Sequence, residues 1–119
     1  MNKKTMKWSE LRSANQIDLI REESKESPVL IFKYSSRCSI SRMALDRLER
    51  NWNESDMQIV KPYFLDLITY RDVSNQIAEV FEVEHESPQV LIIDNEQSVY
   101  DQSHMAIHYE SIKNAVKGR

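Results

Sequence analysis

The chain contains one cysteine, Cys38, which stands in a C-x-x-S arrangement with Ser41 three residues later. An apolar run at 29–32 precedes Cys38 and a helical pattern follows it, so we expect the cysteine at a strand–helix boundary. Free backbone N–H groups and the helix dipole at such a boundary favour the thiolate, which is the nucleophile in thiol–disulfide exchange. Cys38 is therefore the candidate catalytic residue.

Polar side chains near Cys38 are candidates for activating the thiol or binding substrate. Arg37 adds a positive charge, and Ser36, Ser39 and Ser41 could donate hydrogen bonds to the sulfur. Because Ser41 occupies the position of a resolving cysteine and the chain has no second thiol, a mixed disulfide at Cys38 must be resolved by an outside thiol. The alternatives that stay open are an inert, buried Cys38 and a Ser41 with no redox role.

The elements that must position these residues follow from the apolar periodicity. The pattern predicts helices over 13–25, 38–52, 73–81 and 109–117, and strands over 29–32, 62–67, 90–94 and 98–101, with a small leading strand near Trp8 as a further candidate. Strands separated by helices pair in parallel through crossovers, and the late hairpin adds an antiparallel pair. We therefore expect one α/β domain over 1–119 with a thioredoxin-like fold, in which a mixed four- to five-stranded sheet carries helices on both faces.

A second candidate segment, Ser87-Pro88, precedes the apolar run at 90–93. A thioredoxin-like fold keeps a cis-proline at this place, so we predict a cis bond that exposes the Ser87 backbone beside Cys38. A trans proline at the start of an edge strand is the alternative. His85 and His104 are interpreted as hydrogen-bonding residues of the structure or of a second layer around the thiol site. One cysteine without paired histidine spacing predicts no metal site.

Composition excludes several classes of function. The 119 residues are 40% hydrophobic and 29% charged, which is typical of one globular domain. Apolar runs of four residues are too short for a membrane span, and the N-terminal lysines precede no apolar stretch, so we expect a cytoplasmic protein without a membrane partner. A formal charge of -3 without a basic stripe argues against nucleic acid. Gly118 is the only glycine, which excludes glycine-rich nucleotide loops.

The segment FKYSSRCSIS at 32–41 resembles the K-H-S-x-R-C-P-I-S motif of the monothiol bacilliredoxins, the YtxJ-like proteins of the bacillithiol system. Segments 70–78, 85–89 and 103–107 resemble later motifs of that family in order and spacing. The resemblance implies a thioredoxin-like fold, removal of bacillithiol from S-bacillithiolated proteins by Cys38, and the cis-proline role for Pro88. It adds Lys33 to the candidate thiol-activating or substrate-binding residues. The chain departs from the motif at Ser39, where the family has proline, and at Tyr34, where it has histidine.

The expected partners are S-thiolated client proteins and a low-molecular-weight thiol, either bacillithiol or another, acting as co-substrate. We expect no permanently bound cofactor, and a monomer. Two other functions stay open. One is an iron–sulfur carrier like the monothiol glutaredoxins, although their C-G-F-S motif and glycine pair are missing here. The other is a thioredoxin-fold binding module that docks a partner at the Pro88 edge without turnover.

Overall fold

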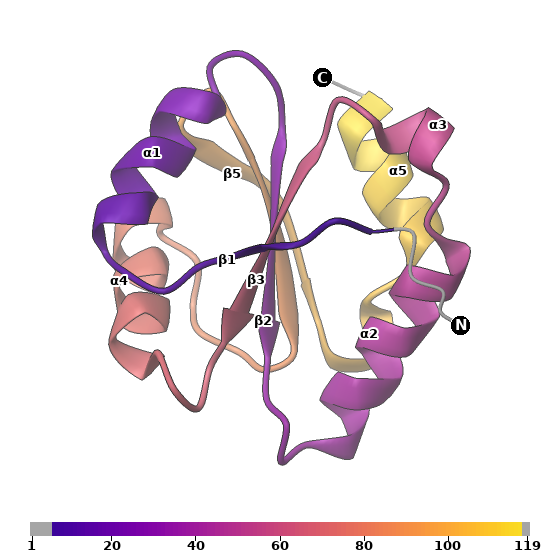
Figure 1. Ribbon diagram of the computed structural model, residues 1–119, viewed down its shortest axis with the longest axis horizontal. Helices are drawn as coiled ribbons and strands as arrows, with labels where there is room; N and C mark the ends of the chain where they lie inside the picture. Colours follow the sequence, from indigo (N-terminus) through magenta and orange to yellow (C-terminus); the bar gives the residue numbers. More distant parts are fainter. Residues whose placement is uncertain (1–5, 118–119) are drawn as a thin grey trace.

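The computed structural model describes residues 6–117 and contains a five-stranded mixed sheet with the strand order β1-β3-β2-β4-β5. The elements in chain order are β1 (Ser9–Glu10), α1 (Asn15–Glu23), β2 (Val29–Tyr34), α2 (Ser39–Asn51), α3 (Glu54–Met57), β3 (Lys61–Asp66), α4 (Arg71–Phe81), β4 (Gln89–Asp94), β5 (Gln97–Ser103), η1 (His104–Ala106) and α5 (Tyr109–Lys117). Helices α1 and α4 cover one face of the sheet, and α2, α3 and α5 lie on the other (Figure 1). This is the α/β thioredoxin-like layout that the sequence predicts.

Strand β2 is central, as its apolar run predicts. It pairs in parallel with β3 and antiparallel with β4, and its first five residues are buried because helices cover both faces. Pro62 fits within β3 because β1 pairs only further along that strand, at Tyr63 and Phe64. The strand that leads to Cys38 is therefore held by a neighbouring strand on each side.

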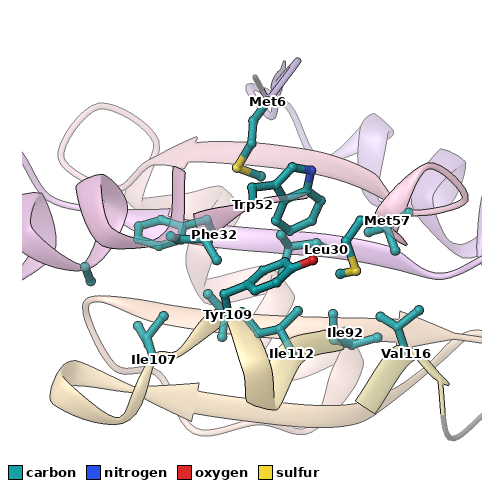
Figure 2. Packing of buried hydrophobic residues seen from close by; sticks show 14 residues of the cluster. Met6, Leu30, Phe32, Trp52, Met57, Ile92, Ile107, Tyr109, Ile112 and Val116 are labelled. Atoms are coloured by element: carbon teal, nitrogen blue, oxygen red, sulfur yellow. The ribbon is translucent and has the colours of Figure 1, made fainter. Parts of the chain in front are cut away.

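Two apolar cores lie on the two faces of the sheet. On the face of α2 and α5, the core contains Phe32 from β2, and the rings of Trp52 and Tyr109 meet edge to face with centroids 5.9 Å apart (Figure 2). On the opposite face, Ile31 packs with the apolar side chains of α1 and α4. Side chains alternate between the faces along β2, so residue 33 points toward α1 and α4.

The first helix is shorter than predicted, spanning 15–23 instead of 13–25. Ala14, not Ser13, is the N-cap residue, and no side chain caps the helix there. Only half of the expected capping box forms: the side-chain oxygen of Gln16 accepts hydrogen bonds from the N–H groups of Arg12 and Ser13, at 2.6 and 3.0 Å. The short helix α3 was not predicted from the periodicity.

The β4–β5 hairpin forms without glycine, as predicted, through the two-residue turn Asn95–Glu96. Both residues adopt positive φ, 53° and 69°. Ser24 stabilises the turn, because its carbonyl accepts from the Asn95 N–H and its hydroxyl from the Glu96 N–H, both at 2.8 Å. Within residues 6–117, the helices are all too short or too polar to cross a membrane.

Candidate functional site

Cys38 is the N-cap residue of α2, at the end of the turn that follows β2. Its backbone is extended (φ -114°, ψ 118°), its N–H donates to the Ser35 carbonyl at 3.2 Å, and its carbonyl accepts from the Arg42 N–H at 3.2 Å. The thiol is partly exposed and makes no capping hydrogen bond. The first turn of α2 contains no acidic residue, so no carboxylate within that turn opposes the positive end of the helix dipole.

Ser41 holds the turn that presents the thiol. Its side chain is fully buried, and its Oγ accepts a hydrogen bond from the Ser35 N–H at 3.0 Å. Ser36 and Ser39 are exposed. In residues 6–117, the hydroxyls of these three serines make no hydrogen bond to the Cys38 sulfur. The structure therefore assigns Ser41 to the turn, in the place where a second cysteine would stand.

Two arginines lie close to Cys38 in the chain. Arg42, on α2, donates from Nη1 to the Ser36 carbonyl at 2.9 Å and so fastens the same turn from outside. Arg37 is exposed and forms no ion pair within the described part of the chain. Its charge is free to meet an anionic ligand or a thiolate.

The Ser87–Pro88 bond is cis, as predicted. The alternative of an edge strand is wrong, because β4 lies between β2 and β5. Lys33 pairs with Gln89 in the β2–β4 ladder, which places Ser87–Pro88 at the end of the sheet from which the chain turns toward Cys38. Pro88 is buried, and the Ser87 hydroxyl oxygen is buried with no hydrogen-bond partner among residues 6–117. Their approach to the Cys38 sulfur stays a prediction.

His104 holds this segment from the side of β5. Its backbone N–H donates to the Pro88 carbonyl at 3.0 Å, and its Nε2 lies 3.2 Å from a carboxylate oxygen of Glu86. Its φ of 57° is left-handed, which ends β5 and begins η1. His104 is thus a positioning residue for the proline segment.

Lys33 and His85 meet on the other face of the sheet. Lys33 is fully buried, and its Nζ lies 3.5 Å from Nδ1 of His85. The hydroxyl of Ser74, on α4, lies 3.2 Å from the same nitrogen. Lys33 therefore points toward α4, and among residues 6–117 its polar contact is with His85 and not with the thiol.

The charges of this cluster change the acidity of both groups. Burial lowers the pKa of Lys33 to about 8, and the nearby Arg71 guanidinium acts in the same direction. Burial also lowers the pKa of His85, with further contributions from the positive charges of Lys33 and Arg71, while the Glu86 carboxylate opposes them. His85 is therefore neutral at physiological pH.

Two polar residues near the site were missed in the sequence: Ser74 and Gln89. Both are buried, Gln89 donates from Nε2 to the Glu84 carbonyl at 3.0 Å, and its Oε1 has no partner among the described residues. The signal for Ser74 is a polar residue on the apolar face formed by Val73 and Ile77. Gln89 directly precedes an apolar strand, and its register opposite Lys33 could not be derived without the fold.

This arrangement can perform thiol chemistry. A partly exposed thiol lies at a helix N-terminus directly after the exposed Arg37. The Ser87–Pro88 segment, whose buried Ser87 hydroxyl has no partner among residues 6–117, lies at the same end of the sheet. Within residues 6–117, no group of three His, Cys, Asp or Glu side chains is placed to hold a metal ion.

Comparisons with known proteins agree with this geometry. The family model described as "Monothiol bacilliredoxin BrxC" matches residues 9–112. A solved structure described as a candidate oxidoreductase with a thioredoxin fold is 33% identical, with 89% of this chain and 90% of that chain covered and a TM-score of 0.76. Thioredoxin from Malassezia sympodialis is 12% identical (99% and 95% covered, TM-score 0.74), and that from Fasciola hepatica is 13% identical (92% and 96%, TM-score 0.69). The two thioredoxins share the fold.

Proposed function

Because the chain belongs to the monothiol bacilliredoxin family, whose members act in thiol–disulfide redox chemistry, we propose that it removes bacillithiol from S-bacillithiolated protein cysteines through Cys38. The observation that carries the proposal is the position of this one thiol. Cys38 is the N-cap residue of a 13-residue helix that follows the central strand, and it is partly exposed. Ser41 is buried in the position that a second cysteine would occupy. Such a site can attack a disulfide and cannot resolve the product alone.

The proposed reaction has two exchange steps. In the first, the Cys38 thiolate attacks the bacillithiol sulfur of the mixed disulfide. The protein–bacillithiol S–S bond breaks, a Cys38–bacillithiol S–S bond forms, and the client cysteine leaves as a thiolate that takes up a proton. In the second, the thiolate of an outside low-molecular-weight thiol, such as a second bacillithiol, attacks that bond. A low-molecular-weight disulfide and free Cys38 result, with no net change in the number of disulfides in either step.

The polar groups around the thiol have separate roles in this proposal. Arg37 stabilises the attacking thiolate and attracts anionic groups of the substrate. Ser41 and Arg42 hold the turn in place. The main chain of Ser87, which forms no hydrogen bond with the described residues, offers a hydrogen-bonding group to the incoming disulfide.

The test is mass spectrometry of the protein after incubation with a bacillithiolated client. We expect one bacillithiol mass on Cys38 and release of the reduced client. Cys38→Ser should show neither, whereas Ser41→Ala should retain much of the transfer, because only the attacking sulfur is indispensable.

Absence of the adduct in the wild type, with the client still bacillithiolated, would contradict the proposal. A client that binds and stays modified would indicate a docking module. Replacing bacillithiol on the client by glutathione or coenzyme A tests the identity of the thiol, and equal transfer from all three would limit the proposal to S-thiolated proteins in general.

A further inference from the structure

The amine of Lys33 is buried without a carboxylate partner among residues 6–117. No part of the side chain is exposed. The positive charge of Arg71 is unfavourable to the charge of Lys33. A buried ammonium without a counter-charge opposes folding. The contact with His85 is therefore the feature that gives Lys33 a role.

We propose that Lys33 and His85 form a positioning link that fastens the Ser87–Pro88 segment to β2 while His85 is neutral and releases it when His85 is protonated. The inference rests on the proposed function, since it concerns how the segment receives the disulfide substrate of Cys38. Neither residue is assigned a contact with the reacting sulfur atoms.

The protonation state of His85 decides whether the link holds. A neutral ring can present the Nδ1 lone pair to the Lys33 ammonium at 3.5 Å or to the Ser74 hydroxyl at 3.2 Å. A protonated ring carries a hydrogen and a positive charge there, and faces a second cation. Arg71, from α4, adds to this repulsion, and Glu86, from the same segment, opposes it while its carboxylate contacts His104. The link is thus closed at neutral pH and opens on acidification.

Among the polar contacts of the described residues, the segment is otherwise held at its ends, from the side of β5 and, through Ser74, from α4. The points of attachment are Glu84 (to Gln89), His85 (to Lys33 and Ser74), Glu86 (to His104) and Pro88 (to His104). Among the polar contacts of residues 6–117, the one from His85 to Lys33 connects the segment to the strand that leads to Cys38. Ser87 makes no hydrogen bond with the described residues, so its position depends on these neighbours. Loss of the His85 contact would leave Ser87 free to move at the place where the substrate must lie.

The experiment compares two reactions of the full chain at about pH 7.5 and at a pH below the midpoint of the His85 NMR titration, because burial and neighbouring cations lower the pKa of His85 from the ordinary histidine value. One substrate is a bacillithiolated protein, which must lie along the Ser87–Pro88 segment. The other is a small aromatic disulfide reagent, which needs only the thiol. We expect Lys33→Met to lower the first rate constant about tenfold more than the second, because a displaced positioning group slows a bound substrate. Lys7→Met, in an exposed position before β1 with no ion pair among residues 6–117, is the matched control.

Two His85 variants test the protonation step. Asn places an acceptor near the position of Nδ1 without titrating, so His85→Asn should recover rate that His85→Ala loses and should show a smaller loss at acidic pH than the wild type. In the wild type, NMR titration of His85 should move to higher pH when Lys33 is replaced by Met, since a neighbouring cation is removed.

An unchanged His85 titration in Lys33→Met, or equal effects of that variant on both substrates, would overturn the link. A wild type that reacts with the reagent and not with the bacillithiolated protein overturns the proposed function instead. The His85 titration still decides the link in that case. If Lys33→Met fails to fold, the His85→Asn and His85→Ala pair gives the same comparison of the two substrates.

Discussion

Replacing Lys33 by methionine should stabilise the protein at neutral pH. The pKa of Lys33 is lowered by burial from 10.5 to about 8, so a difference of about 2.5 pKa units at about 1.4 kcal/mol per unit gives about 3.5 kcal/mol of destabilisation when the amine is charged. Methionine has a similar unbranched shape and no charge to bury. It loses the His85 contact, which is long at 3.5 Å and contributes about 1 kcal/mol. We expect a net gain of about 2.5 kcal/mol at about pH 7.

The stability that the Lys33→Met substitution adds should depend on pH. The folded-state pKa of Lys33 is lower than the unfolded-state value, so the unfolded chain binds the proton more tightly. The destabilisation by Lys33 is therefore absent above about pH 10.5, grows as the pH falls, and is complete below about pH 8. The advantage of Lys33→Met should therefore be largest at about pH 7 and should disappear by about pH 10. Urea unfolding of both proteins across this range measures the difference, and Lys7→Met controls for removing an exposed charge. A difference that stays constant from about pH 7 to about pH 10 would refute the reasoning.

Other predictions concern the turn and the core. Ser41→Ala should destabilise the protein by about 1 kcal/mol in the same unfolding assay, because the partly buried Ser35 N–H loses its acceptor. Ser41→Cys should allow an internal disulfide with Cys38, seen as the loss of both free thiols in a thiol count after mild oxidation; two remaining thiols would contradict the assigned geometry. Tyr63 donates to Glu23 at 2.6 Å and burial raises its pKa to about 12, so Tyr63→Phe should remove the last tyrosine to ionise in an ultraviolet titration.

Much of the fold could be predicted from apolar periodicity. The apolar run of β2 indicates a strand that is buried on both faces, and the apolar residues of α2 recur at helical spacing on one face. The residue at which the first helix begins could not be predicted in the same way. Ser13 has the right spacing for a capping box, yet the side chain of Gln16 satisfies two backbone donors alone, and the helix begins at Asn15.

The site was predictable where its residues are neighbours in the chain. Cys38, Ser41 and the Ser87–Pro88 bond were located from the strand–helix boundary and the proline before β4, and the cis bond is confirmed. The contact of Lys33 could not be predicted, because it depends on the face of β2 to which the side chain points and on His85, which lies far along the chain. Ser74, whose hydroxyl completes that cluster, lies on a helix that no local pattern connects to the thiol.

The buried Ser41 has a consequence for the timing of the proposed cycle. In a protein with two cysteines, an internal attack gives a mixed disulfide a lifetime that is independent of its surroundings. Here the hydroxyl is directed to the Ser35 N–H and the chain has no other thiol, so the covalent intermediate decays only by collision with an outside thiol. Its half-life is then inversely proportional to the concentration of that thiol. The fraction of protein molecules that carry the adduct would follow the state of the cellular thiol pool, and depletion of the pool would trap the adduct.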